Sequence, residues 1–87
     1  MSGLPDKPKL NRHFRMQWEE TQQNHVLLYP EGMIRLNSSA GEILKCCDGT
    51  QTIDEIVTTL ETKFNTTGLG KDIEAMLTHA FQENWIV

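Results

Sequence analysis

Apolar and polar residues alternate with a period of two in the first third of the chain, a pattern typical of β-strands with one buried face. Phe14, Met16 and Trp18 alternate with polar residues and predict a first strand. A polar loop follows, and the apolar run from His25 to Tyr29 then predicts a buried second strand. From Phe14 onward, the pattern therefore predicts two strands joined by a polar connection.

The residues YPEG separate the second strand from a third, predicted over Met33–Leu36. Proline presets the backbone angle φ at the second turn position, and glycine at the fourth position suits a type I turn. Within the third strand, Ile34 and Leu36 share one face, whereas Met33 and Arg35 share the other. This strand leads directly into a helical pattern.

A capping box marks the start of the first helix. In this motif a serine or threonine side chain and a glutamate three residues later each bond a free backbone N–H group. Ser39 and Glu42 have this spacing, although Asn37 or Ser38 could cap the helix instead. Gly49 is the expected end of this helix.

Two further helices follow the first. Thr52 and Glu55 form a second capping box, and the third helix starts at about Lys71, with Asn84 as its left-handed C-cap. The residues after Asn84 must fold back to bury their apolar side chains. The apolar stripes recur at helical spacing, as Ile53, Ile56, Val57, Leu60 and Phe64 in the second helix and as Ile73, Met76, Leu77, Ala80 and Phe81 in the third.

Three strands followed by three helices predict an α+β fold in which an antiparallel sheet packs on a helical trio. The last two helices, joined by a short glycine-containing turn, resemble a helix-turn-helix unit, and the strands would form a wing placed before it. A chain of 87 residues has room for one core. We expect an extended basic arm over residues 1–13 and a single winged-helix domain over residues 14–87.

The net charge of −4 is unevenly distributed. Residues 1–15 carry four basic side chains against one acidic side chain, which is +3, and the remaining chain carries four against eleven, which is −7. An acidic body repels polyphosphate, so nucleic acid is a poor partner for it. The basic arm is expected to be a solvated tail, with contact to an acidic surface as the alternative.

The sequence contains no recognisable catalytic or metal-binding constellation. Its histidines are scattered (His13, His25 and His79), without the spacing of a known metal motif. Cys46 and Cys47 are adjacent and are expected to be two thiols rather than a disulfide. Cys47 falls on the apolar face of its helix, where burial raises the pKa of a thiol and makes it unreactive. We therefore predict that the protein is not an enzyme and uses no cofactor.

Membrane insertion and export are not expected. No apolar run approaches the ~20 residues that a membrane-spanning helix needs. The N-terminal residues lack the apolar segment of a signal peptide, so a cytoplasmic location is the expectation.

Three consecutive motifs, "LLYPEG", "LNSSAGEIL" and "CDGTQTIDEI", resemble the PqqD family of pyrroloquinoline quinone (PQQ) biosynthesis. The resemblance runs from about Pro8 to the C-terminus. Cys46 stands where an apolar residue is usual, and Asn84 replaces a glycine often found before the final apolar residues. Neither departure affects the motifs themselves.

The resemblance implies a binding module rather than a catalyst. PqqD-like proteins are RiPP recognition elements with a winged helix-turn-helix fold. They bind the ribosomal precursor peptide PqqA and present it to the radical SAM enzyme PqqE, which cross-links a glutamate and a tyrosine within the peptide. The family's peptide adds as an extra strand beside the third strand, in a groove against the third helix.

The third strand suits this role if it lies at a sheet edge, because its unpaired backbone groups are then a template for another strand. For the helix residues in the groove, plain core packing is the alternative, and it is favoured for Leu77. Two other functions stay open, a winged-helix nucleic-acid binder and a self-associating structural protein that forms a homodimer through a free edge. The candidate peptide contacts are Met33, Ile34, Arg35 and Leu36 in the strand and Ile73, Met76, Leu77 and Ala80 in the helix.

Overall fold

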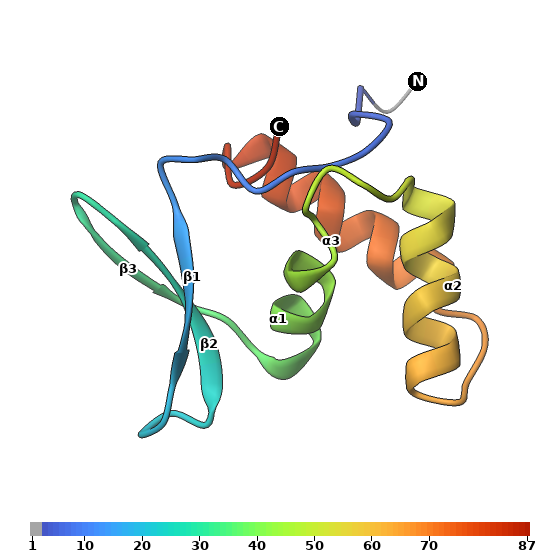
Figure 1. The fold of residues 1–87 in the computed structure, drawn as a ribbon, viewed down its shortest axis with the longest axis horizontal. Helices are drawn as coiled ribbons and strands as arrows, with labels where there is room; N and C mark the ends of the chain where they lie inside the picture. The colour runs from blue at the N-terminus through green and yellow to red at the C-terminus, as the bar shows by residue number, and fades with distance from the viewer. Residues whose placement is uncertain (1–2) are drawn as a thin grey trace.

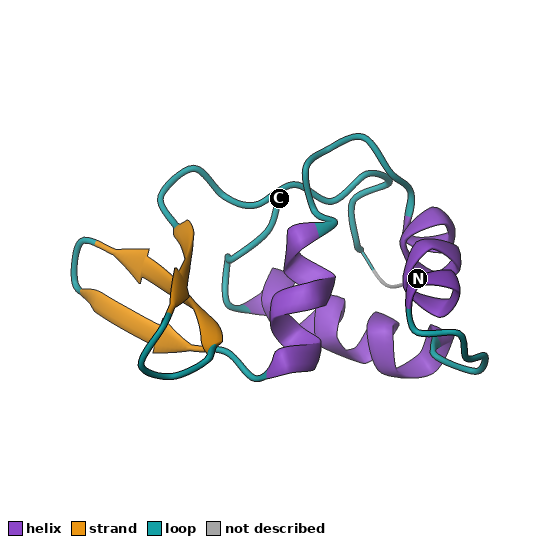
Figure 2. Cartoon of the chain, turned by 60° about the horizontal axis from the view of Figure 1, so that its bottom comes forward, coloured by secondary structure: helices purple, strands orange, loops and turns teal. Residues whose placement is uncertain are grey.

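The computed structural model describes residues 3–87 and contains three strands followed by three helices (Figure 1). The sheet stands at one end of the molecule, and α2 lies farthest from it (Figures 1 and 2). The predicted α+β order is therefore confirmed. The elements are β1 (Arg15–Glu19), β2 (Asn24–Tyr29), β3 (Gly32–Arg35), α1 (Ser38–Lys45), α2 (Ile53–Lys63) and α3 (Gly70–Gln82).

The sheet is antiparallel, with β2 in the centre and β1 and β3 at its two edges. Leu27 of β2 lies opposite Met16 of β1 and opposite Ile34 of β3. Leu27 is fully buried, and Met16 and Ile34 pack against the same core. This face of the sheet therefore meets the helices, as the period-two pattern predicts.

A close approach between α1 and β2 joins the sheet to the helices. A Cβ atom at Gly41 of α1 would lie 3.0 Å from Nδ1 of His25 in β2. Glycine therefore lets the helix pack directly on the strand. The buried core behind this contact comprises Leu27, Leu36, Ala40, Ile43, Leu44, Cys47, Ile56, Leu60, Ile73, Leu77, Ala80, Trp85 and Ile86.

Two details of the predicted helix ends differ in the structure. Asn37 caps α1, since its Oδ1 accepts a hydrogen bond from the backbone N–H of Ala40 at 2.7 Å. The predicted box of Ser39 and Glu42 is not formed, because Glu42 bonds to Lys63 of α2 instead. The helix ends at Lys45, and Gly49 takes its positive φ in the turn that follows.

The other predicted caps are confirmed. Thr52 and Glu55 form a reciprocal capping box at the start of α2. After α3, Asn84 adopts a left-handed conformation with φ 65°, and the N–H of Trp85 bonds to the carbonyl of Ala80 at 2.8 Å. This Schellman motif turns Trp85 and Ile86 back into the core.

Part of the predicted N-terminal arm is packed on the domain rather than solvated. Pro8 is fully buried, and Lys9 exchanges two backbone hydrogen bonds with Val87, at 3.0 and 2.8 Å. Leu10 donates to the carbonyl of Cys47, and Asn11 donates to that of Trp85. The solvated-tail expectation is therefore wrong for residues 8–11, which lie along the C-terminal segment (Figure 1). Residues 1–2 lie outside the described part, and the division at residue 13 stays a prediction.

Two phenylalanines that the helical stripes place in the core are more exposed than predicted. Phe64 is 49% exposed, and Phe81 is 37% exposed. Phe64 lies one residue beyond the end of α2, where Asn65 turns the chain away with φ 52°. The stripe is therefore buried at Ile56 and Leu60 but ends before Phe64.

Within residues 3–87, every helix is too short or too polar to cross a bilayer. The same residues contain no group of three or more histidine, cysteine or acidic side chains that could hold a metal ion.

Candidate functional site

Among residues 3–87, β3 is paired with another strand, β2, on one side only. The N–H of Leu36 donates to the carbonyl of His25 at 3.1 Å, which fixes the phase of the ladder between β3 and β2. Because bonded and non-bonded pairs alternate in an antiparallel ladder, Ile34 also bonds to β2. Met33 and Arg35 then direct their N–H and C=O groups away from β2, toward the open edge.

The outer edge of β3 is not paired with another strand in the part of the chain that the structure describes. Among residues 3–87, no backbone segment bonds to the outward groups of Met33 or Arg35. The Met33 side chain is 45% exposed and that of Arg35 is also exposed, both on the sheet face opposite the core. An unpaired edge of this kind is a template for an additional strand.

An apolar pocket of about 350 Å³ opens between the three helices. It begins at Ser38 and Ser39, which follow the end of β3 after two intervening residues. The first residues of the pocket wall therefore lie close in sequence to the end of β3. The pocket is lined by Ser38, Ser39, Glu42, Ile43, Leu60, Phe64, Thr66, Leu69, Asp72 and Ile73.

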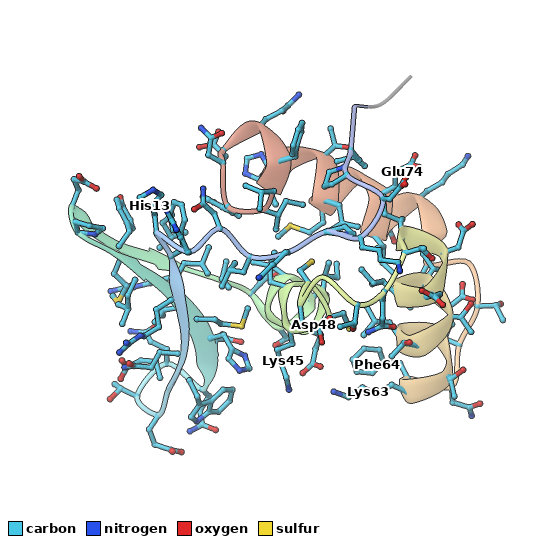
Figure 3. All side chains as sticks on the ribbon, turned by 45° about the horizontal axis from the view of Figure 1, so that its top comes forward. His13, Lys45, Asp48, Lys63, Phe64 and Glu74 are labelled. Carbon is cyan, nitrogen blue, oxygen red and sulfur yellow. The ribbon has the colours of Figure 1, made fainter. Side chains whose placement is uncertain are left out.

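Charged side chains hold two of the helices around the pocket. Lys63 of α2 donates a hydrogen bond to Glu42 of α1, and Lys45 lies 3.9 Å from the same carboxylate. The hydrogen bond from Lys63 is the main reason that the pKa of Glu42 is below its usual value. Figure 3 shows Lys63 and Phe64 extending from the end of α2 toward α1.

The start of α3 is fixed by α2. Leu69 occupies the N-cap position of α3 and provides no side-chain cap. Instead, its backbone N–H donates to Oε2 of Glu61 in α2 at 3.0 Å. This bond positions the first turn of α3, which carries Asp72 and Ile73 to the pocket.

Of the four predicted strand residues, two are exposed at the β3 edge and two face the core. Met33 and Arg35 are exposed at β3, Ile34 is half-buried on the core face, and Leu36 is 5% exposed. Leu36 lies just past the end of β3 but continues its ladder. Their contact with a peptide stays a prediction.

The four predicted helix residues do not lie together at the surface. Leu77 and Ala80 have no exposed surface and pack inside the core, as the core-packing alternative predicts. Ile73 is also buried but forms part of the pocket wall, and Met76 is half-buried against the core. Ile73 and Met76 are therefore the members of this set that a ligand reaches most easily.

Sequence reasoning missed most of the pocket wall. Phe64 was assigned to the core, and Leu69 fell in the glycine-containing turn before α3. Ser39 and Glu42 have the spacing of a capping pair, which gives no indication that they line a pocket. Asn65 is the one sequence feature that could have placed Phe64 in the pocket wall. Asparagine readily adopts a left-handed conformation, and here it ends α2 and leaves Phe64 beside the mouth of the pocket.

The two cysteines differ in accessibility. Burial raises the pKa of the Cys47 thiol to about 12, and it also raises the pKa of Cys46, which is half-buried. At pH 8 a thiol with the pKa of Cys47 carries only about one thiolate in 10⁴ molecules. Cys47 is therefore the less reactive of the two.

We expect native Cys47→Ala protein to react with Ellman's reagent at pH 8 at least about tenfold faster than native Cys46→Ala protein. Both variants should react rapidly in denaturant, which confirms that each retains one free thiol. Equal rates in native buffer would contradict the burial of Cys47.

The sequence of the chain is similar to those of known proteins. Residues 24–86 match the family described as "Coenzyme PQQ synthesis protein D (PqqD)", and this match covers most of the chain. The chain belongs to the PqqD family. Its resemblance to that family, read from the three sequence motifs, is thus confirmed.

Curated members of the PqqD family are similar over nearly the whole chain. A protein of Methylococcus capsulatus named "PqqA binding protein" is 47% identical over 87 residues, covering 99% of this chain and 94% of the relative. A protein of the same name from Acinetobacter baylyi is 48% identical over 84 residues, covering 95% of this chain and 85% of the relative. The match to the Methylococcus protein therefore includes the described part of the N-terminal arm.

A solved PqqD structure has the same fold. The NMR structure of the PqqD truncation of Methylobacterium extorquens PqqCD superposes with a TM-score of 0.74 at 27% identity. The superposition covers 99% of this chain and 96% of that one. That protein is described as a functional, stand-alone RiPP recognition element.

Proposed function

We propose that this protein binds the precursor peptide PqqA as an additional strand on β3 and presents it to the radical SAM enzyme PqqE. The observation that carries the proposal is the open edge at Met33 and Arg35, whose outward backbone groups have no partner among residues 3–87. Membership of the PqqD family and the name "PqqA binding protein" of its relatives support the choice of peptide.

Backbone pairing and side-chain contacts have different roles in this mode of binding. Each backbone hydrogen bond contributes roughly 0.5–1.5 kcal/mol whatever the peptide sequence. Selectivity must come from side chains seated in pockets. The apolar pocket that begins at Ser38 is well placed to receive an apolar side chain from a peptide running past Arg35.

The role of the module in biosynthesis is that of a scaffold. The module captures the flexible peptide on β3 and contacts PqqE through a different surface. The bound peptide is thereby held near the enzyme that modifies it. Such linkage raises the local concentration of the peptide and increases avidity by roughly 10²–10⁴. No step of this mechanism requires a catalytic side chain of the module.

Fluorescence anisotropy of a labelled synthetic PqqA peptide tests the binding step. We expect saturable 1:1 binding that unlabelled PqqA reverses, and weaker binding of a peptide with the reversed sequence. Duplex DNA of similar length is the control for the nucleic-acid alternative and should not compete. Absence of saturation up to about 1 mM peptide, or equal affinity for the reversed sequence, would contradict the proposal.

The presentation step is tested separately with PqqE. We expect the cross-linking of the glutamate and the tyrosine in PqqA to require addition of this protein in stoichiometric amounts. Unchanged cross-linking in its absence would contradict the scaffold role without affecting the binding result.

A further inference from the structure

Arg35 is a cation without an acidic partner in the described part of the chain. Its side chain is exposed on the sheet face opposite the core. Among residues 3–87, the ion pairs are those that Lys45 and Lys63 make with Glu42. No carboxylate in this range lies within ion-pair distance of the Arg35 guanidinium. The acidic body of the protein therefore has an unpaired positive charge at the open edge of β3.

The nearest neighbours of Arg35 on its own face of the sheet are uncharged. Val26 of β2 lies opposite Arg35, and Gln17 of β1 lies opposite Val26, so the three residues form one row across the sheet. Met33 is the preceding side chain on the same face of β3. The row ends at Arg35, and a strand added to β3 would continue it.

An added strand places one of its residues directly beside Arg35. Because Arg35 directs its backbone groups outward, an antiparallel partner residue exchanges hydrogen bonds with it. The Cβ atoms of residues opposite each other in such a pair lie about 4.5–5.5 Å apart, on the same face of the sheet. The peptide side chain at this position is therefore within reach of the guanidinium.

A carboxylate is the side-chain group that best matches this position. The guanidinium carries its N–H donors in a planar fork, and two of them fit the two oxygens of a carboxylate. Opposite charges that face each other across two strands stabilise the pairing, whereas like charges destabilise it. The position beside Arg35 therefore favours aspartate or glutamate and disfavours lysine or arginine.

The peptide residues before and after the acidic one face the opposite side of the sheet, because side chains alternate along a strand. They lie beside Ile34 and Leu36, whose side chains face the core. Apolar side chains match these two positions. The alternation is the same for a parallel and an antiparallel strand, so the expected order apolar, acidic, apolar does not depend on the direction of the peptide.

We propose that Arg35 is a specificity-determining residue, which selects a peptide segment with an acidic residue between two apolar residues. The inference rests on the proposed addition of PqqA to β3, and it specifies which kind of segment β3 binds. Because Arg35 is exposed, salt screens its attraction for the carboxylate, and the selection weakens as the ionic strength rises.

Double-mutant cycles with the labelled PqqA peptide test this inference by fluorescence anisotropy. Each acidic residue of the peptide is replaced in turn by its amide, and every peptide is titrated with the parent chain and with Arg35→Gln. We expect Arg35→Gln to bind PqqA about threefold more weakly than the parent does. At one acidic position, between two apolar residues, the amide should weaken binding to the parent by a similar factor but leave binding to Arg35→Gln unchanged.

Charge reversal gives a second test of the same pair. A peptide with lysine at the coupled position should bind Arg35→Glu at least about fivefold more tightly than it binds the parent, because the opposite charges are restored with their signs exchanged. This difference should shrink in 0.5 M salt. Circular dichroism checks that each variant is folded.

Arg15→Glu is the matched control. It makes the same charge change on the same sheet face, but Arg15 lies in β1, three strand spacings or about 14 Å from the added strand. At 0.15 M salt, where charges are screened over about 8 Å, this control should change the affinity for PqqA less than twofold.

Several results would overturn the inference while leaving the proposed function intact. They are parental affinity of Arg35→Gln for PqqA, the absence of an acidic position coupled to Arg35, a coupled residue with polar neighbours, and an equal loss of affinity in Arg15→Glu. A peptide that does not bind the parent at all would instead overturn the proposed function, and the inference with it.

Discussion

Met33→Pro should weaken binding of the PqqA peptide by roughly fivefold or more while leaving the fold intact. Proline lacks a backbone N–H, and the N–H of Met33 points to the open edge rather than to β2. Proline is tolerated at such positions of edge strands because no ladder bond is lost. One lost backbone bond costs roughly 0.5–1.5 kcal/mol, and the proline ring also obstructs the approaching strand.

Two matched variants separate this effect from other consequences of the substitution. Met33→Ala removes the exposed side chain but keeps the N–H, and should bind the peptide almost as the parent does. Leu36→Pro breaks the bond from Leu36 to His25 and disturbs a buried side chain, so it should lower the free energy of unfolding by roughly 3 kcal/mol. Equal peptide affinities for Met33→Pro and Met33→Ala would contradict strand addition at this position.

Deleting residues 2–11 should lower the free energy of unfolding by roughly 2–4 kcal/mol, about as much as truncating a large buried side chain. The deletion removes the backbone bonds of Lys9 with Val87, and those of Leu10 and Asn11 with the domain. It also uncovers the core beside Pro8, which is fully buried. In a domain of this size, a loss of that magnitude is a large fraction of the total stability.

Urea unfolding followed by tryptophan fluorescence measures this loss against the parent chain. A chain without residues 2–11 that unfolds at the parent's midpoint would show that the packed segment contributes nothing to stability.

Local patterns were sufficient to predict the elements and the faces of β3. Alternation in Met33–Leu36 correctly placed Ile34 and Leu36 toward the core, because a strand exposes successive side chains on opposite faces. Thr52 and Asn84 correctly marked helix ends, since each acts on backbone groups within a few residues of itself.

Features that depend on distant contacts were not predictable from such patterns. The segment around Pro8 has the composition of a tail, and only the returning C-terminal residues give it partners. Glu42 has the spacing of a capping residue, yet Lys63 of another helix competes for its carboxylate. The pocket likewise arises where three helices meet, so its wall combines Phe64 and Leu69 with residues of α1.

Amide hydrogen exchange at β3, measured by NMR with and without the PqqA peptide, tests the central claim most directly. In the free protein the N–H groups of Met33 and Arg35 should exchange rapidly, whereas that of Leu36 should be protected by its bond to His25. Saturating peptide should slow exchange at both Met33 and Arg35 by at least about tenfold. Exchange at these two amides that stays equally fast in the complex would contradict strand addition at the β3 edge.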